Sequence, residues 1–247
     1  MKERMMEEWN NGMSEGWNNG KVELEQQRLY PKLFTFYFLL LLFTFYFLLF
    51  TFYLKKMGQK LVFATNNQHK LDEVQLKVGN SFKIVSLKEI GCFEDIEETG
   101  LTLEENASIK SQYIYKNYNL DCFADDTGLE IFALNNEPGV YSARYSGDRD
   151  FTKNMDLVLQ KMQGINDRGA RFRTVISLII EGKEHLFEGI VNGTIRTEKS
   201  GEEGFGYDPI FEPEGYNITF AEMSLEEKNI ISHRGRAMEK LIQFLKN

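Results

Sequence analysis

The 247-residue sequence has little cysteine, histidine or proline, with two, three and four residues of each. Cys92 and Cys122 form no Cys-x-x-Cys pair and no Cys/His cluster, which argues against a structural zinc site and indicates two reduced, buried or half-buried thiols. Positive charge is also scarce, because 29 Lys and Arg residues stand against 37 Asp and Glu residues, a net charge of −8. Nucleic acid is therefore not an expected partner. An anionic ligand would have to be held by a few local cations or by a metal.

The first part of the chain differs from the rest. Leu33–Leu54 contains no charged residue and is long enough for a bilayer crossing, which needs about 20 apolar residues. The segment is also repetitive, because FTFYFLL occurs at 34–40 and again at 43–49. Translation of AT-rich DNA upstream of a gene would give such a repeat, so we favour a misassigned start codon with the true start at Met57. A single-pass anchor and a signal-like segment are the alternatives.

We therefore predict a low-complexity leader at 1–56 and one globular domain at 57–247. The hydrophobic fraction of 42% and the charged fraction of 27% are ordinary for a globular protein. A membrane contact is expected only if the 33–54 segment is genuinely expressed.

Apolar and polar residues alternate along the globular part in a way that predicts both strands and helices. Strands are predicted at 60–65, 82–85, 121–124, 171–181 and 184–197, the last two joined as a hairpin at Gly182-Lys183. Helices are predicted at 69–78, after a capping box at Thr102 and Glu105, at 151–163 and from Ser232 onward, with a loop at 200–215. This alternation predicts an α/β domain with a mixed sheet.

A polar loop, ATNNQHK, follows the first predicted strand and begins a helix. Backbone amides at a helix N-terminus bind anions. Thr65 and Asn66 can donate hydrogen bonds, and Lys70 can meet a phosphate as a point charge. An ordinary capped helix start would use the same residues, so this motif alone does not decide between the two.

Two acidic pairs occur in the first half of the domain, at Glu97-Glu98 and at Asp125-Asp126. The second pair follows the short apolar strand CFA, and open α/β sheets bind ligands at such strand ends. Adjacent carboxylates repel each other, and Mg²⁺ needs only one or two carboxylates beside substrate phosphates. Solvated acids and an Asx-turn are the alternative interpretations.

Two further motifs could recognise a planar ligand. Phe205, in the Gly-rich segment 204–209, could stack on a base, a contact worth on the order of 1–3 kcal/mol, although a plain turn with buried aromatics fits equally well. Ser232 is a good N-cap and places His233 and Arg234 in the first helical turn. Positive charge is unfavourable there, which indicates an anion or a base edge nearby.

Six segments, in this order, resemble the inosine/xanthosine triphosphate pyrophosphatase family: ATNNQHK, EETGLTLEENA, FADDTGLE, PGVYSARYSG, GFGYDPIF and EEKNIISHRGRA. They span residues 60–247, and the leader has no counterpart in the family. The resemblance implies a magnesium-dependent hydrolase that converts ITP, dITP and XTP to the monophosphate and pyrophosphate and so cleanses the nucleotide pool. It also implies an elongated α/β fold with a mixed central sheet flanked by helices, two lobes with an active-site cleft between them, a homodimer and a cytoplasmic location.

The resemblance also implies roles for single residues. Asp126 would be the general base and, with Glu98, a ligand of Mg²⁺. Thr127, where the family often has Ser, would contact the substrate. The triphosphate would be held by Thr65, Asn66, Asn67, Gln68, His69 and Lys70; the base and sugar by Phe205, Gly206, Tyr207 and Asp208; phosphate or base by Lys228; and the purine's 6-oxo edge by His233 and Arg234. Asn66 departs from the family's frequent glycine, a mild change because Asn tolerates left-handed backbone angles.

The mechanistic hypothesis is that Asp126 activates a water that attacks between the α and β phosphates, while Lys70 and Lys228 offset the charge of the leaving group. Hydrogen-bond donors on His233 and Arg234 would favour a purine with a 6-oxo group and disfavour ATP. Three other functions stay open: a nucleotide-binding module without catalysis, a membrane-anchored interaction protein built on residues 33–54, and a pyrophosphatase for pyrimidine or methylated nucleotides.

Overall fold

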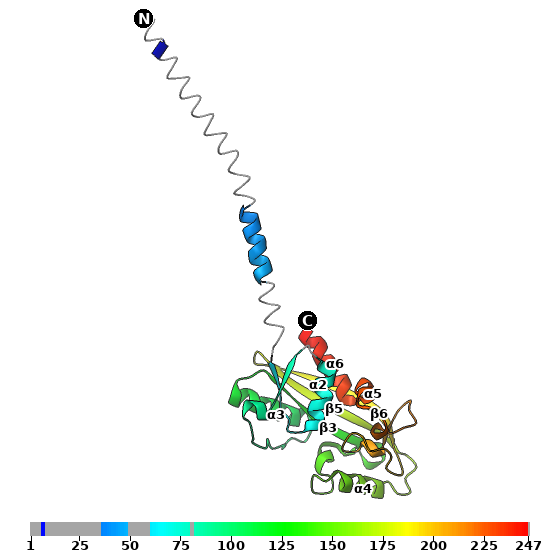
Figure 1. Cartoon of the computed structure of the whole chain (residues 1–247). Coiled ribbons are helices and arrows are strands. Elements are labelled where there is room, and N and C mark those ends of the chain that lie inside the picture. Colours follow the sequence, from blue (N-terminus) through cyan, green and yellow to red (C-terminus); the bar gives the residue numbers. More distant parts are fainter. Residues whose placement is uncertain (1–5, 8–35, 49–59, 80–81, 247) are drawn as a thin grey trace. The chain divides into compact units, whose positions relative to one another are not determined.

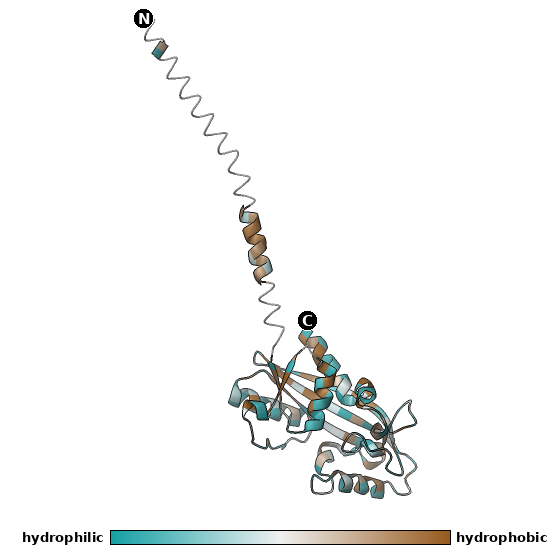
Figure 2. Cartoon of the chain, in the orientation of Figure 1, coloured by the Kyte–Doolittle hydropathy of each residue, from teal (hydrophilic) through white to brown (hydrophobic). Residues whose placement is uncertain are grey.

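The computed structural model describes residues 6–7, 36–48, 60–79 and 82–246, which fall into two compact units, Met1–Met57 and Gly58–Asn247. In the first unit, residues 36–48 form an almost wholly apolar helix with exposed side chains (Figure 2). Within the described residues, no helix combines the length and apolarity that a bilayer crossing requires. Apart from residues 6–7, the remainder of the predicted leader lies outside the described residues.

The second unit is built on a seven-stranded mixed sheet in the order β2-β1-β3-β5-β6-β7, with β4 paired to β3 (Figure 1). Strand β1 is parallel to β2 and β3, and the other pairs are antiparallel. The strands are β1 Lys60–Phe63, β2 Lys83–Ser86, β3 Cys122–Ile131, β4 Glu137–Pro138, β5 Gly169–Ile180, β6 Lys183–Ile195 and β7 Phe211–Pro213. The α/β class and the mixed sheet predicted from the sequence are confirmed.

Helices cover both faces of this sheet. The α-helices are α2 Gln68–Val78, α3 Leu103–Tyr118, α4 Phe151–Lys161, α5 Leu225–Ile231 and α6 His233–Lys246. Short 3₁₀ helices lie at η1 Lys88–Ile90, η2 Phe132–Leu134, η3 Gly139–Arg144, η4 Asp208–Ile210 and η5 Phe220–Glu222. Alternate strand residues face opposite sides, so Leu61 and Phe63 pack in the core with α2 and α6, whereas Val62 and Ala64 pack in the core with α3.

The most consequential wrong prediction concerns β3. A short strand was predicted at 121–124, with the acidic motif as a loop after it, whereas β3 runs for ten residues through that motif. The reason is the antiparallel partner β5, which pairs with β3 from Cys122 to Ile131. The parallel partner β1 pairs only as far as Phe63, opposite Phe123. Asp125 and Asp126 therefore lie just beyond the carboxyl end of β1.

Other differences are smaller. The predicted hairpin is present, with Glu181 (φ 49°) and Gly182 (φ 76°) both in the left-handed region of a primed turn. The predicted loop at 200–215 contains η4 and the short strand β7. Helix α5 was not predicted, although Ser224 and Glu227 form a capping box at its start.

One glycine brings α6 close to the sheet. A Cβ atom on Gly189, in β6, would lie 2.0 Å from the carbonyl oxygen of His233 and 2.5 Å from the amide nitrogen of Ala237. Such distances are far below van der Waals contact, so only glycine allows this approach of helix to strand. The first turn of α6 therefore rests directly on β6.

Candidate active site

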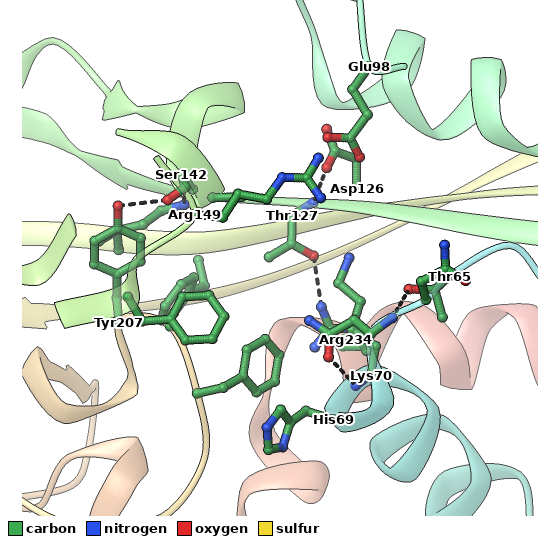
Figure 3. Close-up of a pocket in the computed structure, with 18 of the residues that line it drawn as sticks. Thr65, His69, Lys70, Glu98, Asp126, Thr127, Ser142, Arg149, Tyr207 and Arg234 are labelled. Carbon is green, nitrogen blue, oxygen red and sulfur yellow. Dashed lines mark hydrogen bonds between the residues drawn. The ribbon is translucent and has the colours of Figure 1, made fainter. Parts of the chain in front are cut away.

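The structure gathers most of the predicted site residues around one cavity of about 480 Å³, a size typical of small-molecule sites (Figure 3). The predicted residues that line it are Thr65, Asn66, Asn67, His69, Lys70, Glu98, Asp126, Thr127, Phe205, Gly206, Tyr207, Asp208, Lys228, His233 and Arg234. Gln68 is the exception, because its side chain is exposed and donates a hydrogen bond to Asp72 (2.8 Å) instead of lining the cavity. Cys92 and Cys122 are buried free thiols, as predicted.

The polar loop after β1 is shaped by its own side chains. Asn67 is the N-cap of α2 and accepts a hydrogen bond from the amide of Lys70 (3.3 Å). Thr65 accepts one from the amide of Asn67 (3.2 Å). These bonds hold the N-terminus of α2 against the cavity, and a helix N-terminus attracts anions.

Asp125 faces the cationic side of the site. Its carboxylate accepts hydrogen bonds from Lys70 Nζ (2.8 Å) and Arg234 Nε (2.9 Å). Burial alone would raise the pKa of Asp125, but these two cations outweigh burial and hold it far below its usual range. Asp125 is therefore a permanent carboxylate that fixes Lys70 and Arg234.

Asp126 belongs to a second cluster on the other side of β3, as alternation along a strand requires. Lys110 Nζ lies 3.8 Å from its Oδ1, and Asn106 donates to its Oδ2 (3.0 Å). Burial is the largest cause of a raised pKa for Asp126, and the neighbouring Glu98 adds to the rise. Asp126 is thus a buried carboxyl group that holds its proton more readily than an exposed aspartate.

Glu98 lies beside Asp126 in Figure 3, and the two carboxylates share one lysine. Lys110 Nζ is 2.6 Å from Glu98 Oε1 and also donates to the carbonyl oxygen of Asp125 (2.7 Å). Burial would raise the pKa of Glu98, but Lys110 outweighs it and lowers that pKa. Asn106 also accepts from the amide of Gly100 (2.8 Å) and so ties the Glu98 loop to β3.

This acid pair fits the needs of Mg²⁺. Across the part of the chain that the structure describes, no group of three or more His, Cys, Asp or Glu side chains is arranged to hold a metal. Magnesium does not require one, because it keeps several waters and uses one or two carboxylates beside substrate phosphates. Glu98 and Asp126 supply two carboxylates at the same cavity, so the donor set suits this cation.

Glu73, on α2, is the residue that the sequence reasoning missed most clearly. It is 2% exposed and pairs with Lys228 Nζ (2.7 Å) and with the guanidinium of Arg234. Burial would raise the pKa of Glu73, but Arg234 and Lys228 outweigh it and lower that pKa. Asp208 also accepts from Lys228 Nζ (2.7 Å). Lys228 and Arg234 are therefore held in place before any ligand binds.

An anion or a base edge was expected beside Arg234, and the structure has the carboxylates of Asp125 and Glu73 there. Its third contact is a hydrogen bond to Thr127 Oγ1 (3.1 Å). With its nitrogens engaged in this way, Arg234 serves first to position the acids and Thr127.

His233 is not the positive side chain that was predicted. It is 3% exposed and lies flat against Phe172, with ring centroids 4.6 Å apart. Burial, the largest cause, and the cations Arg234 and Lys228 lower the pKa of His233 well below its usual value, so its imidazole is neutral. Within the described residues its Nδ1 has no hydrogen-bond partner.

The Gly-rich segment shapes the other wall of the cavity. Tyr207 is buried and donates its hydroxyl to the carbonyl oxygen of Ser142 (2.8 Å). Asp208 accepts from the amide of Phe205 (2.8 Å), and Gly204 has a φ of 76°, where a Cβ atom would lie 2.2 Å from Asp208 Oδ2. Tyr207 and Asp208 thus fix the loop that presents Phe205.

The chain matches the model of the Ham1 family over residues 61–244. A dITP/XTP pyrophosphatase of Flavobacterium psychrophilum is 54% identical over 189 residues, which cover 76% of this chain and 100% of that protein. A dITP/XTP pyrophosphatase of Porphyromonas gingivalis is 50% identical over 189 residues, 76% of this chain and 97% of that protein.

Solved structures agree with these relatives. The Staphylococcus aureus Ham1 protein has a TM-score of 0.70 and 42% identity, covering 76% of this chain and 98% of that chain. The nucleoside-triphosphatase / dITP/XTP pyrophosphatase of Mycobacterium abscessus has a TM-score of 0.61 and 42% identity, covering 74% of this chain and 98% of that chain. The resemblance predicted from the six sequence segments is confirmed, and this chain belongs to the Ham1 family.

Proposed function

We propose that this chain hydrolyses the non-standard purine nucleoside triphosphates dITP, XTP and ITP to the monophosphate and pyrophosphate, and so removes them from the nucleotide pool. Family membership and the activity named for its close relatives support this substrate class. The observation that carries the reaction is the pairing of Glu98 and Asp126 around Lys110, in the same cavity as Phe205. A binding module without catalysis would use the aromatic ring but not the acid pair.

Asp126 is the proposed general base. Its raised pKa makes its carboxylate a stronger proton acceptor than an exposed aspartate, which suits removal of a proton from water. Asn106 and the amide of Thr127 (3.0 Å) each hold one of its oxygens. The water oxygen bonds to phosphorus, the phosphorus–oxygen bond between the α and β phosphates breaks, and the water's proton passes to Asp126.

Mg²⁺ is the proposed cofactor, held by Glu98 and Asp126 together with the substrate phosphates. When bound, it would neutralise charge on the phosphates and favour ionisation of water. Lys70, near the N-terminus of α2, is the proposed partner of the leaving pyrophosphate, in addition to its ion pair with Asp125.

The purine is proposed to stack on Phe205 with its 6-position toward His233. A neutral imidazole carries one donor and one acceptor, and His233 lines the cavity and has a buried Nδ1 without a hydrogen-bond partner within the described residues. A 6-oxo group accepts a hydrogen bond, whereas the 6-amino group of ATP presents another donor. Such mismatches can cost several powers of ten in rate, so ATP is a poor substrate under this proposal.

The remaining expectations belong to the same proposal. They are a catalytic domain at 57–247, an elongated body of two lobes with the active-site cleft between them, a homodimer, and a cytoplasmic location. The family resemblance supports each of them.

The test is release of pyrophosphate from dITP, XTP, ITP, GTP and ATP by the full chain with Mg²⁺. Fast release from the first three and slow release from ATP is the expected pattern. Equal rates on ITP and ATP would contradict the specificity, and release of orthophosphate without pyrophosphate would contradict the reaction.

A further inference from the structure

We propose that Arg149 is an additional substrate-binding residue of this site, which contacts the phosphate chain of the nucleotide from the mouth of the cavity. This inference rests on the proposed function, because it names a further contact for the same substrate. None of the sequence motifs included Arg149.

Arg149 lies in the loop between η3 and α4, lines the cavity and is exposed. Figure 3 shows its guanidinium extending toward the acid pair, on the same side of the cavity as Glu98 and Asp126. It is also among the cations that lower the pKa of Glu98, which agrees with this proximity.

The other Lys and Arg residues that line the cavity are already engaged with carboxylates. Lys70 pairs with Asp125 (2.8 Å), and Lys110 with Glu98 (2.6 Å). Lys228 pairs with Glu73 and Asp208, both at 2.7 Å, and Arg234 with Asp125 (2.9 Å) and Glu73. Over residues 60–79 and 82–246, by contrast, no hydrogen bond or ion pair joins Arg149 to another side chain.

The neighbours of Arg149 in its loop do not neutralise it either. Asp148 pairs with Lys153 (2.8 Å). Asp150 is the N-cap of α4 and accepts from the amide of Lys153 (3.1 Å). The guanidinium therefore keeps its full set of donors for a ligand.

The charge balance of the cavity makes this free guanidinium important. Five engaged cations face five carboxylates, so the cluster carries no net charge when all are ionised. The cations are Lys70, Lys110, Arg144, Lys228 and Arg234, and the carboxylates are Glu73, Glu98, Asp125, Asp126 and Asp208. A triphosphate carries several negative charges and gains little from such a cluster alone. A guanidinium binds phosphate oxygens in a bidentate manner, so Arg149 supplies an unpaired cation in addition to the paired Lys70.

The experiment compares R149A and R149K with the wild-type full chain, and uses K183A as a control that removes an exposed cation of β6 outside the cavity. Two probes separate the parts of the substrate: pyrophosphate, which is only phosphate, and inosine, which has none. For R149A we expect the KM for ITP and the inhibition constant of pyrophosphate to rise about tenfold or more, as for loss of a charge-assisted hydrogen bond. The inhibition constant of inosine should stay within twofold. R149K should recover part of the loss.

Changes below threefold in both the KM and the pyrophosphate constant would overturn the proposal. An equal rise for inosine would also overturn it, since that would place Arg149 at the base or sugar. Circular dichroism and thermal unfolding of R149A, with R149Q as a second variant, exclude a folding defect as the cause. If the wild-type chain hydrolyses no triphosphate, the proposed function fails, while calorimetric titration of wild type and R149A with pyrophosphate still tests Arg149.

Discussion

The imidazole of His69 lies flat against the ring of Phe205, with centroids 5.2 Å apart and planes inclined by 14°. His69 is in the first turn of α2, and Phe205 precedes η4, so the stack joins two segments that are distant in sequence. Lys228 Nζ (5.0 Å) and the guanidinium carbon of Arg234 (5.7 Å) also lie near the ring of Phe205. A base that stacks on Phe205 therefore enters a slot bordered by an imidazole and by cations.

This stack predicts that His69 contributes to base binding more than to phosphate binding. H69A should raise the KM for ITP about two- to tenfold with little change in kcat, as expected for loss of one aromatic contact. H69F should keep the wild-type KM, because it retains a flat ring. Steady-state kinetics of both variants checks this, with Q68A, which alters an exposed neighbour outside the cavity, as the control. An H69F variant as impaired as H69A would contradict the prediction.

The two adjacent aspartates should respond differently to the same change. D126N should lower kcat at least about a hundredfold while thermal stability is kept, because it removes the proposed base but leaves a polar side chain. D125N should lower the free energy of unfolding by about 3–5 kcal/mol, because it leaves Lys70 and Arg234 without their shared carboxylate. Kinetics and urea unfolding of both variants test this pair. A D126N enzyme with full activity would falsify the assignment of the base.

Glu98 should determine how much Mg²⁺ the activity requires. E98Q should require a several-fold higher Mg²⁺ concentration for half-maximal activity, because a neutral amide is a weaker ligand for a hard cation. Removal of Mg²⁺ with a chelator should abolish activity of the wild-type chain, and added Mg²⁺ should restore it. E97Q, which changes the adjacent acid, is the matched control and should have a normal Mg²⁺ requirement. Identical Mg²⁺ titration curves for E98Q and wild type would exclude Glu98 as a ligand.

Glu73 should link stability to pH. Its pKa is lower in the folded chain than the unfolded value of 4.5, so it contributes stability above that pH, and the contribution is lost as the pH falls through the folded pKa. E73Q should therefore lower the free energy of unfolding by about 3–5 kcal/mol at pH 7, because Lys228 and Arg234 each lose a carboxylate partner. The difference from wild type should shrink in acid. Urea unfolding at pH 7 and at progressively lower pH measures this, and a difference that does not change with pH would contradict it.

Much of the site could be predicted because its residues lie in continuous segments with local signals. The loop after β1, the motif around Asp126, the segment presenting Phe205 and the start of α6 each combine a strand or helix boundary with polar residues. Lys110 carried a weaker signal, as a lysine on the same helical face as the buried Leu103 and Ala107.

The rest depended on contacts that sequence spacing does not encode. Glu73 looks like a solvated helix residue, and only the packing of α2 against α6 brings it to Arg234. The length of β3 was underestimated because polar residues in a strand suggest its end, whereas the pairing with β5 and the buried cations satisfy them here. No local sequence signal marks Arg149, because it reaches the cavity from a loop between two helices.

Gly189 affects the structure beyond strand β6. Because it has no side chain, the backbone carbonyl of His233 can pack against β6, and this contact fixes the position of the His233 imidazole relative to the sheet. A Cβ atom at this position would clash with the first turn of α6 and displace His233. The proposed purine site therefore depends partly on a residue that does not itself line the cavity.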